Sequence, residues 1–297
     1  MIVIKLRGGL ANQMFQYAIG RRISYQYKVP LLIDVCHYED EQTEEKTIRE
    51  FGLNWFNIDV TIASAAQISN SKGWYSNTIK RKANTLFNKM LPYYKQNIVK
   101  EKQTSFDKNI LKVRKNCYLE GFWQSAQYFK DIEEIIRKDF QFKIPPSSGN
   151  IEYLNQIGNC NSVSVHIRRG DYVTSKHYNN VHQVLSPEYY QKAATIIEEQ
   201  ITNPTYFVFS DDPQWAKENL IFKHKAVFID HNNGKNAFED LRLMSNCKHH
   251  IIANSTFSWW GAWLNPNKDK IVIAPDKWYK MEKLENKDIL PEKWIRL

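Results

Sequence analysis

The sequence predicts an α/β fold with two Rossmann-like domains facing a cleft, each a parallel sheet covered by helices. Short apolar segments rich in β-branched residues alternate with segments of helical periodicity, the pattern of a parallel sheet with both faces covered. The length of 297 residues suits two domains. The run Pro145-Pro146-Ser147-Ser148-Gly149 has the composition of a linker. We therefore expect domains over residues 1–145 and 150–297.

The N-terminal half gives clear patterns only at its two ends. The expected elements are strands at 2–6, 30–35 and 117–120 and helices at 12–27 and 125–140. Residues 36–116 are polar and basic, and their pattern assigns no element. Within them, Lys80-Arg81-Lys82 is expected to be a solvated face.

The C-terminal half alternates regularly. Ser186-Pro187-Glu188 marks a helix start, with serine at the N-cap and proline at the first helical position. The expected strands cover residues 162–167, 205–209, 225–230, 249–253 and 270–274. Two expected helices cover residues 214–219 and 237–246, and two more begin at residue 186 and at about residue 258.

Composition limits the classes of partner and compartment. The formal charge is +9, from 41 Lys and Arg against 32 Asp and Glu, which favours nucleic acid, a phosphorylated small molecule or an acidic membrane surface without choosing among them. The cysteines at 36, 117, 160 and 247 are too widely spaced for a zinc ribbon or a CxxC motif, which favours a reduced protein. Lys5 and Arg7 interrupt the first apolar run, and no run is long enough to span a membrane. We expect a cytoplasmic protein, with peripheral attachment to an anionic membrane surface left open.

Four polar or glycine-bearing clusters follow predicted strands. They cover residues 8–13, 166–171, 210–212 and 254–258. Open α/β sheets bind ligands beyond the carboxyl ends of their strands, so a cleft between the two domains would bring these clusters together.

Arg168-Arg169 is the sharpest of these signals. Paired guanidinium groups suit phosphate oxygens, and an ion pair between Arg168 and Asp171 is the structural alternative. Residues 254–258 offer hydroxyls and free N–H groups at a helix start, an anion site, and plain capping by Ser255 or Thr256 is the alternative there.

The other signals are weaker. Gly8-Gly9 does not form a GxGxxG motif, so the glycines serve close backbone approach to a ligand or a tight turn. Asp211-Asp212 suits either a metal with a diphosphate or a helix cap, and we favour the cap. His249-His250 alternates across a strand, so both side chains cannot bind one ion.

Three longer segments stand out together: residues 8–17 (GGLANQMFQY), 166–172 (HIRRGDY) and 254–264 (NSTFSWWGAWL). Together they resemble glycosyltransferase family 11, the α-1,2-fucosyltransferases, and the chain looks like a bacterial member. The likeness runs from Met1 to about Pro275 and is weakest between Asp40 and Asn116. The second segment is shared with α-1,6- and protein O-fucosyltransferases. Ala11 departs from the usual Leu-Gly-Asn and should be tolerated unless its φ is positive.

The resemblance implies a GT-B-like fold and inverting, metal-independent transfer of L-fucose from GDP-β-L-fucose to the 2-hydroxyl of a galactoside. The donor would be held mainly by the C-terminal domain, leaving the acceptor side to the N-terminal domain, where residues 36–116 would shape it. The acceptor would be a galactose-terminated glycan or a lipid-linked oligosaccharide in surface polysaccharide synthesis. No cofactor is expected.

The resemblance also assigns residues by position. Arg168 would contact the β-phosphate, with Arg169 beside it, and Asp240 and His166 would hold guanine. Catalysis would involve Arg168 with Asp171 or His182 as candidate base, or the leaving phosphate itself would take the proton. The remaining donor-binding assignments are Gly8, Gly9, Asn12 and Gln13 in the first domain and Asn254, Ser255, Thr256 and Phe257 in the second.

Three alternative functions stay open at this point. Another GDP-sugar-dependent transferase would share the same signals. A nucleotide-sugar epimerase or dehydrogenase is disfavoured because GxGxxG and TyrxxxLys are absent at strand-following positions. A nucleic-acid-binding protein would interleave basic and aromatic residues on a sheet face, whereas the arginines here cluster at one turn, so we expect no nucleic acid.

Overall fold

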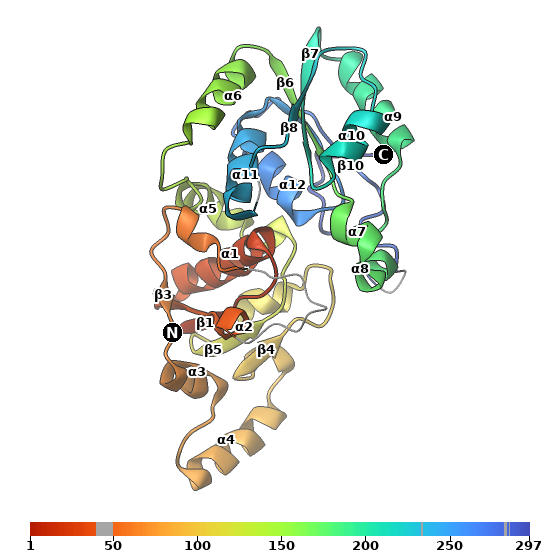
Figure 1. The fold of residues 1–297 in the computed structure, drawn as a ribbon. Coiled ribbons are helices and arrows are strands. Elements are labelled where there is room, and N and C mark those ends of the chain that lie inside the picture. The colour runs from red at the N-terminus through yellow and green to blue at the C-terminus, as the bar shows by residue number, and fades with distance from the viewer. Residues whose placement is uncertain (40–49, 233, 282–283, 285) are drawn as a thin grey trace. The chain divides into compact units, whose positions relative to one another are not determined.

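The computed structural model describes residues 1–39, 50–232, 234–281, 284 and 286–297 and divides the chain into two compact units. Unit 1 covers Met1–Lys143 and unit 2 covers Ile144–Leu297. The division falls one residue before Pro145-Pro146, whose rings restrict the backbone of residues 144–146 directly after the junction. Each unit has its own sheet (Figure 1).

The described part of unit 1 contains a five-stranded parallel sheet in the order β3-β2-β1-β5-β4. The strands are β1 Ile2–Lys5, β2 Leu31–Asp34, β3 Thr61–Ile62, β4 Ile98–Lys100 and β5 Cys117–Glu120. The α-helices are α1 Leu10–Tyr27, α2 Cys36–Glu39, α3 Ala65–Lys72, α4 Thr78–Met90 and α5 Glu133–Asp139.

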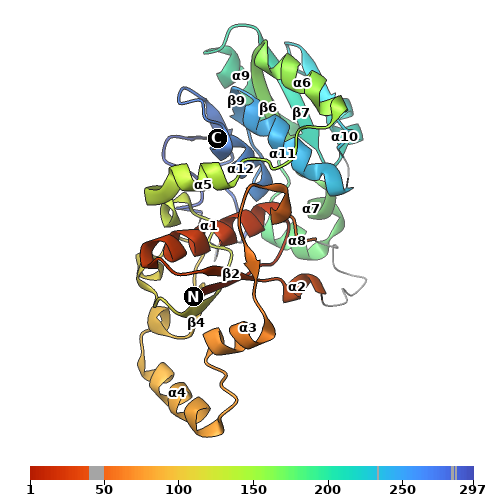
Figure 2. The ribbon, with the colours of Figure 1, turned by 90° about the vertical axis from the view of Figure 1, so that its left-hand side faces the viewer.

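Both faces of the unit 1 sheet are covered because β1 is apolar on both sides. Val3 packs with Ile68 of α3, and Ile4 packs toward α1. A Cβ on Gly20 of α1 would meet the Leu31 side chain at 2.8 Å, so this glycine lets the helix lie close to β1 and β2. The buried face of α1 makes it the central helix of the unit. In Figures 1 and 2, α4 lies beyond α3 at the periphery of the unit.

The described part of unit 2 contains a six-stranded parallel sheet in the order β11-β10-β9-β6-β7-β8. The strands are β6 Asn161–Ile167, β7 Pro204–Ser210, β8 Ala226–Ile229, β9 His249–Ile251, β10 Val272–Ala274 and β11 Ile295–Arg296. The α-helices are α6 Ser148–Gly158, α7 Gly170–Thr174, α8 Lys176–Val181, α9 Pro187–Glu198, α10 Pro213–Asn219, α11 Ala237–Asn246 and α12 Thr256–Leu264.

Alternating side chains of β7 build two cores. Tyr206 and Val208 pack with α9 and α10 on one face of the sheet. Phe207 and Phe209 pack with α6 and α11 on the other. Figure 1 shows these two helix layers on either side of β7. The predicted parallel α/β architecture is therefore confirmed for this unit.

Several sequence expectations were wrong in detail. Residues 125–140 form two 3-10 turns, Ala126–Tyr128 and Lys130–Ile132, before α5 begins, because Phe129 between them has φ −134° and breaks the helix. Helix α6 starts inside the expected linker, at Ser148. Helix α12 begins at Thr256 rather than Ser258.

Other elements were missed altogether. Strands β3, β4 and β11 have two or three residues each, too few for a period to show, and α7 and α8 are single short turns of helix. Helix α4 was also missed, although its apolar residues recur at helical spacing, and none of its residues is buried. Residues 40–49 of the unassigned segment lie outside the described residues.

Candidate active site

The carboxyl ends of neighbouring strands in unit 2 gather most of the polar clusters found in the sequence. The register of β6 and β7 pairs Ile167 with Ser210, so Arg168 and Asp211 follow side by side. Strand β9 lies on the other side of β6 and leads to Asn254 and the start of α12. Because the sheet is parallel, these ends meet at one edge, the usual ligand edge of an open α/β sheet.

Arg168 is held between two carboxylates. Its Nη2 lies 2.7 Å from Asp171 Oδ2, and its Nη1 lies 3.0 Å from Asp211 Oδ2. Burial opposes the charge of the guanidinium, but Asp211 and Asp171 outweigh it and raise the pKa of Arg168 above its ordinary value. The two bonds engage one Nη each of a group with five N–H donors, so donors remain for an anion. The ion pair with Asp171, which was the structural alternative to phosphate recognition, is therefore present. The remaining N–H groups of Arg168 can still bind an anion.

Arg169 turns to the other side of the strand end. Its Nε lies 3.3 Å from Asp212 Oδ2, and its guanidinium lies 3.9 Å from the ring centroid of Trp215 in α10. Its backbone N–H donates to Asp211 Oδ1 at 2.8 Å. The structure thus separates the two arginines, with only Arg168 between two acids.

Asp211 and Asp212 have different partners, as Arg168 and Arg169 do. Asp212 is the N-cap of α10 and accepts from the Trp215 N–H, so the cap hypothesis is confirmed for this residue. Asp211 holds Arg168 and the Arg169 backbone instead. Among the residues that the structure describes, no group of three or more His, Cys, Asp or Glu is arranged to hold a metal ion.

The start of α12 is built from residues 254–257. Ser255 is its N-cap and accepts from the Phe257 N–H at 3.3 Å, so the capping alternative is present. Asn254 is buried and donates to the carbonyls of Gln183 and Trp278. Its carbonyl oxygen accepts from the Tyr172 hydroxyl at 3.0 Å, which ties the start of α12 to α7 beside Arg168. Thr256 is the first residue of the helix.

His166 lies on β6 facing α12. Its ring centroid is 5.9 Å from that of Phe257. Burial, with a smaller contribution from the charge of Arg168, lowers the pKa of His166 to about 3. Its Nδ1 is buried and makes no hydrogen bond within the part of the chain that is described. His166 is therefore a neutral imidazole with an unused polar atom.

Asp240, on the first turn of α11, is held by a buried amide network. Its Oδ1 accepts from Asn232 Nδ2 at 2.8 Å, and Asn232 in turn exchanges hydrogen bonds of 2.9 and 3.0 Å with Asn150. Burial raises the pKa of Asp240 to about 7; the hydrogen bond from Asn232 opposes this shift, and the charge of Glu239 adds to it. The carboxyl is therefore costly to ionise until donors arrive to stabilise it.

His182 stacks on Tyr172, which contacts Arg168. The rings of His182 and Tyr172 lie 4.6 Å apart and 4° from parallel, and the Arg168 guanidinium lies 5.6 Å from the same tyrosine ring. Tyr279 contacts His182 at 5.7 Å between centroids. The imidazole is thus packed among aromatic rings rather than extended into solvent.

The neighbouring histidines of β9 have structural roles. His249 Nδ1 accepts from the Ile271 N–H at 3.1 Å, and His250 Nε2 lies 2.7 Å from Asn265 Nδ2. Both side chains are buried, so they belong to the core.

In unit 1, the loop after β1 and the start of α1 contain the predicted residues Gly8, Gly9 and Asn12. Gly8 has φ +77°, where L-residues are strained, and a Cβ there would meet Asn12 Nδ2 at 2.8 Å. Asn12 Oδ1 accepts from Gln124 Nε2 at 2.9 Å. Gly9 is the N-cap residue of α1, and Ala11 lies within that helix without a positive φ, so alanine is tolerated as expected.

Gln13 lies beneath the same loop. It is fully buried, its Nε2 donates to the Gly8 and Glu50 carbonyls, and its Oε1 accepts from the Gly52 N–H. These bonds engage both ends of the amide, so Gln13 holds the loop together and positions Gly8.

A second loop, which the sequence pattern did not single out, lies at the same edge of the unit 1 sheet. It follows β5 and contains Trp123, whose φ of 56° is left-handed, and Gln124, which bonds to Asn12. The Glu101 carboxylate accepts from the N–H groups of Phe122 and Trp123 at 2.7 and 2.8 Å and holds this conformation. A signal was present, because residues 121–124 directly follow the strand predicted at 117–120.

The decisive comparison is with family models. The model described as glycosyl transferase family 11 matches residues 65–297. The chain belongs to this family. The architecture agrees, since a variant of Arabidopsis thaliana FUT1 in complex with GDP superposes with a TM-score of 0.51 at 9% identity, covering 92% of this chain and 70% of that one. This enzyme is therefore a glycosyltransferase with a GT-B-like fold.

Individual relatives span the whole chain. An Escherichia coli alpha-1,2-colitosyltransferase is 36% identical over 100% of this chain and 99% of its own length. The Escherichia coli O-antigen biosynthesis glycosyltransferase WbnK is 34% identical over 98% of this chain and 99% of its own. A galactoside alpha-(1,2)-fucosyltransferase 1 from Mus musculus is 30% identical over 49% of this chain and 41% of its own.

No described helix of this glycosyltransferase combines the length and the apolar character needed to cross a membrane.

Proposed function

We propose that this enzyme transfers L-fucose from GDP-β-L-fucose to the 2-hydroxyl of a galactoside, with inversion at the anomeric carbon, in surface polysaccharide synthesis. The observation that carries the proposal is Arg168, a cation held in place at the end of β6 beside the start of α12. A fixed guanidinium and a helix N-terminus suit a leaving diphosphate. Family membership and the α-1,2 linkage in the names of relatives support the reaction class.

In this proposal, Arg168 meets the charge that develops on the β-phosphate. The acceptor oxygen forms a bond to the anomeric carbon of fucose as the bond from that carbon to the phosphate oxygen breaks, and GDP leaves with the electron pair. Asp171 and Asp211 hold the guanidinium so that it does not reorganise during the step. Ser255, Thr256 and Phe257 would bind the diphosphate through hydroxyl and backbone groups, and Arg169 would support the turn from its place on Trp215.

Asp240 and His166 would recognise guanine. A carboxylate accepts hydrogen bonds from both N1–H and the exocyclic amine of guanine, and uracil lacks this pair of donors. The network of Asn232 and Asn150 fixes one oxygen of Asp240 in advance. The neutral imidazole of His166 offers a hydrogen-bonding atom without a competing charge.

The proton of the acceptor hydroxyl has three candidate destinations. Asp171 is already paired with Arg168, which makes it a better orienting group than a base. His182 is an imidazole, whose ordinary pKa suits proton transfer near neutral pH, and it is held by Tyr172 on the same turn as Arg168. The leaving phosphate is the third candidate. We favour His182.

The reaction is proposed to need no metal. Asp171 and Asp211 are paired with Arg168, and Asp212 caps α10, so all three carboxylates are already bound to groups of the protein. Arg168 and the α12 terminus would carry the leaving-group charge that a metal ion carries in other transferases.

A second donor has a specific observation in its favour. The relative that is 36% identical over the whole chain is named for colitose, which is L-fucose without its 3-hydroxyl. A site that hydrogen-bonds a substrate hydroxyl rejects the analogue lacking it by roughly 10⁴–10⁵, whereas an apolar site discriminates only weakly against an added hydroxyl. The ratio of kcat/KM for the two donors therefore distinguishes a fucosyltransferase from a colitosyltransferase.

The test is a donor and acceptor matrix. Full-length enzyme is incubated with GDP-fucose, GDP-colitose or a UDP-sugar and a panel of β-galactosides, including galactose-terminated lipid-linked oligosaccharides, and the linkage is determined by NMR. The proposal expects α-1,2-linked fucose with GDP-fucose and no product with the UDP-sugar. Exclusive use of GDP-colitose would replace the donor assignment, and equal calorimetric affinity for GDP and UDP would overturn the guanine assignment.

A further inference from the structure

Helix α4 is amphipathic, but its apolar face points away from the protein. Ile79, Ala83, Leu86, Phe87 and Met90 follow the spacing that gathers side chains on one helix face. The four large ones are exposed by 79%, 67%, 56% and 79% respectively. Globular proteins normally turn such a face toward their core, so this arrangement requires an explanation.

The polar side of α4 makes the contacts to unit 1. Asn84 Nδ2 donates to the Gly73 carbonyl at 3.3 Å, and Asn88 Oδ1 accepts from the Asn97 N–H at 2.8 Å. Asn84 and Asn88 are the two residues of α4 that are not fully exposed. Because they lie on the side opposite the apolar residues, the orientation of the helix is fixed with its apolar face outward.

The chain segment that contains α4 carries most of the net positive charge of the enzyme. Between Asp59 and Glu101 the sequence has no Asp or Glu and seven Lys and Arg: Lys72, Lys80, Arg81, Lys82, Lys89, Lys95 and Lys100. The rest of the chain has 34 Lys and Arg against 32 Asp and Glu, so this segment carries seven of the nine net positive charges. A field of one sign next to an apolar face favours an anionic, partly apolar partner.

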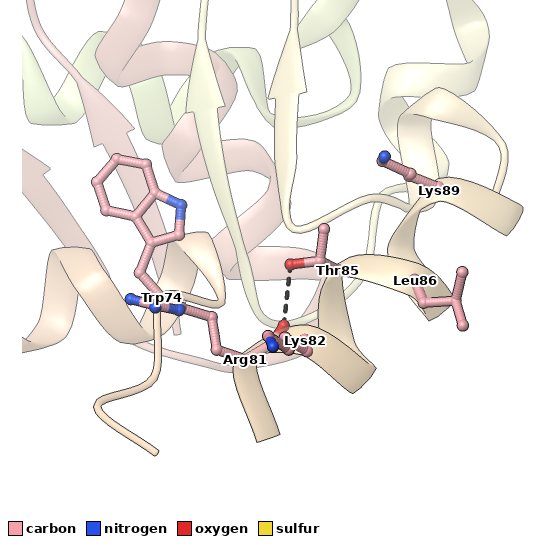
Figure 3. Close-up of a pocket in the computed structure, with 6 residues that line it drawn as sticks. All are labelled: Trp74, Arg81, Lys82, Thr85, Leu86 and Lys89. Carbon is pink, nitrogen blue, oxygen red and sulfur yellow. Dashed lines mark hydrogen bonds between the residues drawn. The ribbon is translucent and has the colours of Figure 1, made fainter. Parts of the chain in front are cut away.

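A pocket joins the two features. It has a volume of about 590 Å³ and lies on the basic edge of α4 next to Leu86. Its lining combines cations with an exposed indole, as Figure 3 shows, and consists of Trp74, Arg81, Lys82, Thr85, Leu86 and Lys89. Lysine and arginine beside tryptophan at the edge of an apolar face is the arrangement that lies at a lipid headgroup boundary.

We propose that α4 is a membrane-binding helix that lies in the surface of a bilayer containing anionic phospholipids, with its apolar face among the acyl chains and its cations at the headgroup phosphates. Two other occupants fit less well. An RNA strand would pair the cations but leave Ile79, Leu86 and Met90 in water. A second copy of the chain would bring its own Lys80, Arg81, Lys82 and Lys89 against the same four cations of α4. The proposal is independent of the donor and acceptor of the transfer reaction.

The test is sedimentation of the full-length enzyme with vesicles. We expect binding to phosphatidylcholine vesicles containing about one third phosphatidylglycerol, weak binding to pure phosphatidylcholine, and weaker binding as salt rises. In the charge variant, Lys80→Gln, Arg81→Gln and Lys82→Gln together should lower the partition coefficient about 100-fold, at about fivefold for each cation. In the apolar variant, Ile79→Ser, Leu86→Ser and Phe87→Ser together should lower it about 10-fold or more.

The matched control removes one exposed isoleucine and two exposed lysines from unit 2. Ile221→Ser, Lys223→Gln and Lys225→Gln together should leave vesicle binding unchanged. Since all substituted residues are exposed, thermal unfolding of every variant should match the parent. A control variant that loses binding as much as the α4 variants would overturn the proposal. So would single-stranded RNA that binds more tightly than the vesicles and is unaffected by the apolar variant.

Discussion

Replacing Arg168 with lysine keeps one positive charge at the end of β6 but removes the planar fork that holds it. In the structure, Nη1 and Nη2 reach Asp211 and Asp171 separately, at 3.0 and 2.7 Å. A lysine ammonium is a single point charge on a flexible stem and cannot keep both carboxylates in these positions while facing a phosphate. Arg168→Lys therefore tests whether catalysis depends on geometry rather than on charge alone.

Two magnitudes follow. Loss of one donor aimed at developing charge typically costs 10²–10³ in kcat, or about 2.7–4 kcal/mol, and we expect Arg168→Lys to lower kcat by roughly 10²-fold or more. The Arg168 side chain is 23% exposed and its two partners 12% and 25%, so we expect a loss of stability of about 1–2 kcal/mol. Such a loss corresponds to a fall in Tm of roughly 2–8 °C, which leaves the enzyme folded in the assay.

The matched control is Arg169→Lys at the adjacent position. Arg169 makes a 3.3 Å contact to Asp212, whose side chain is 38% exposed, so the substitution should change kcat by less than about fivefold. Steady-state kinetics with GDP-fucose, calorimetry with GDP and thermal unfolding are measured for both variants. A folded Arg168→Lys enzyme with near wild-type kcat, or equal losses in the two variants, would refute the assignment of Arg168 to the transition state.

Three further predictions concern the same site. The carboxyl of Asp240 is protonated below a pKa of about 7, whereas binding of guanine needs it ionised, so the affinity for GDP should fall about tenfold from pH 8 to pH 6. Calorimetry of Asp240→Asn should show weak GDP binding that does not depend on pH. A pH-independent affinity in the parent enzyme would contradict the assignment. Turnover should persist in EDTA, and complete loss restored by Mn²⁺ would return Asp211 and Asp212 to the mechanism. His182→Ala should lower kcat, keep the affinity for the donor and remove the acidic limb of the pH–rate profile. Asp171→Asn should lower kcat by displacing Arg168 and should keep that acidic limb. If His182→Ala keeps both the rate and the acidic limb, His182 is not the base.

Strands β6 to β10 of unit 2 and the ligand edge of its sheet could be predicted from the sequence. Each strand is a short apolar segment with a local pattern, and the carboxyl ends of parallel strands meet at one edge whatever the details of packing. This is why the order of residues along the chain was enough to group 166–171, 210–212 and 254–258. In residues 36–116 of unit 1, β3 and β4 could not be predicted, because two or three residues are too few for a period to show.

Only the tertiary structure decided which partner each polar side chain takes. Arg168 meets Asp211 because the register of β6 and β7 pairs Ile167 with Ser210, a long-range alignment that no local pattern specifies. Gln13 is indistinguishable from a ligand-binding residue in sequence, and its burial follows from the chain segment at Glu50 and Gly52 folding over it. The residues of α4 show an amphipathic helix, but the direction of its apolar face depends on hydrogen bonds to Gly73 and Asn97, outside the helix. Periodicity is a property of the local chain, whereas pairing depends on contacts between segments distant in sequence.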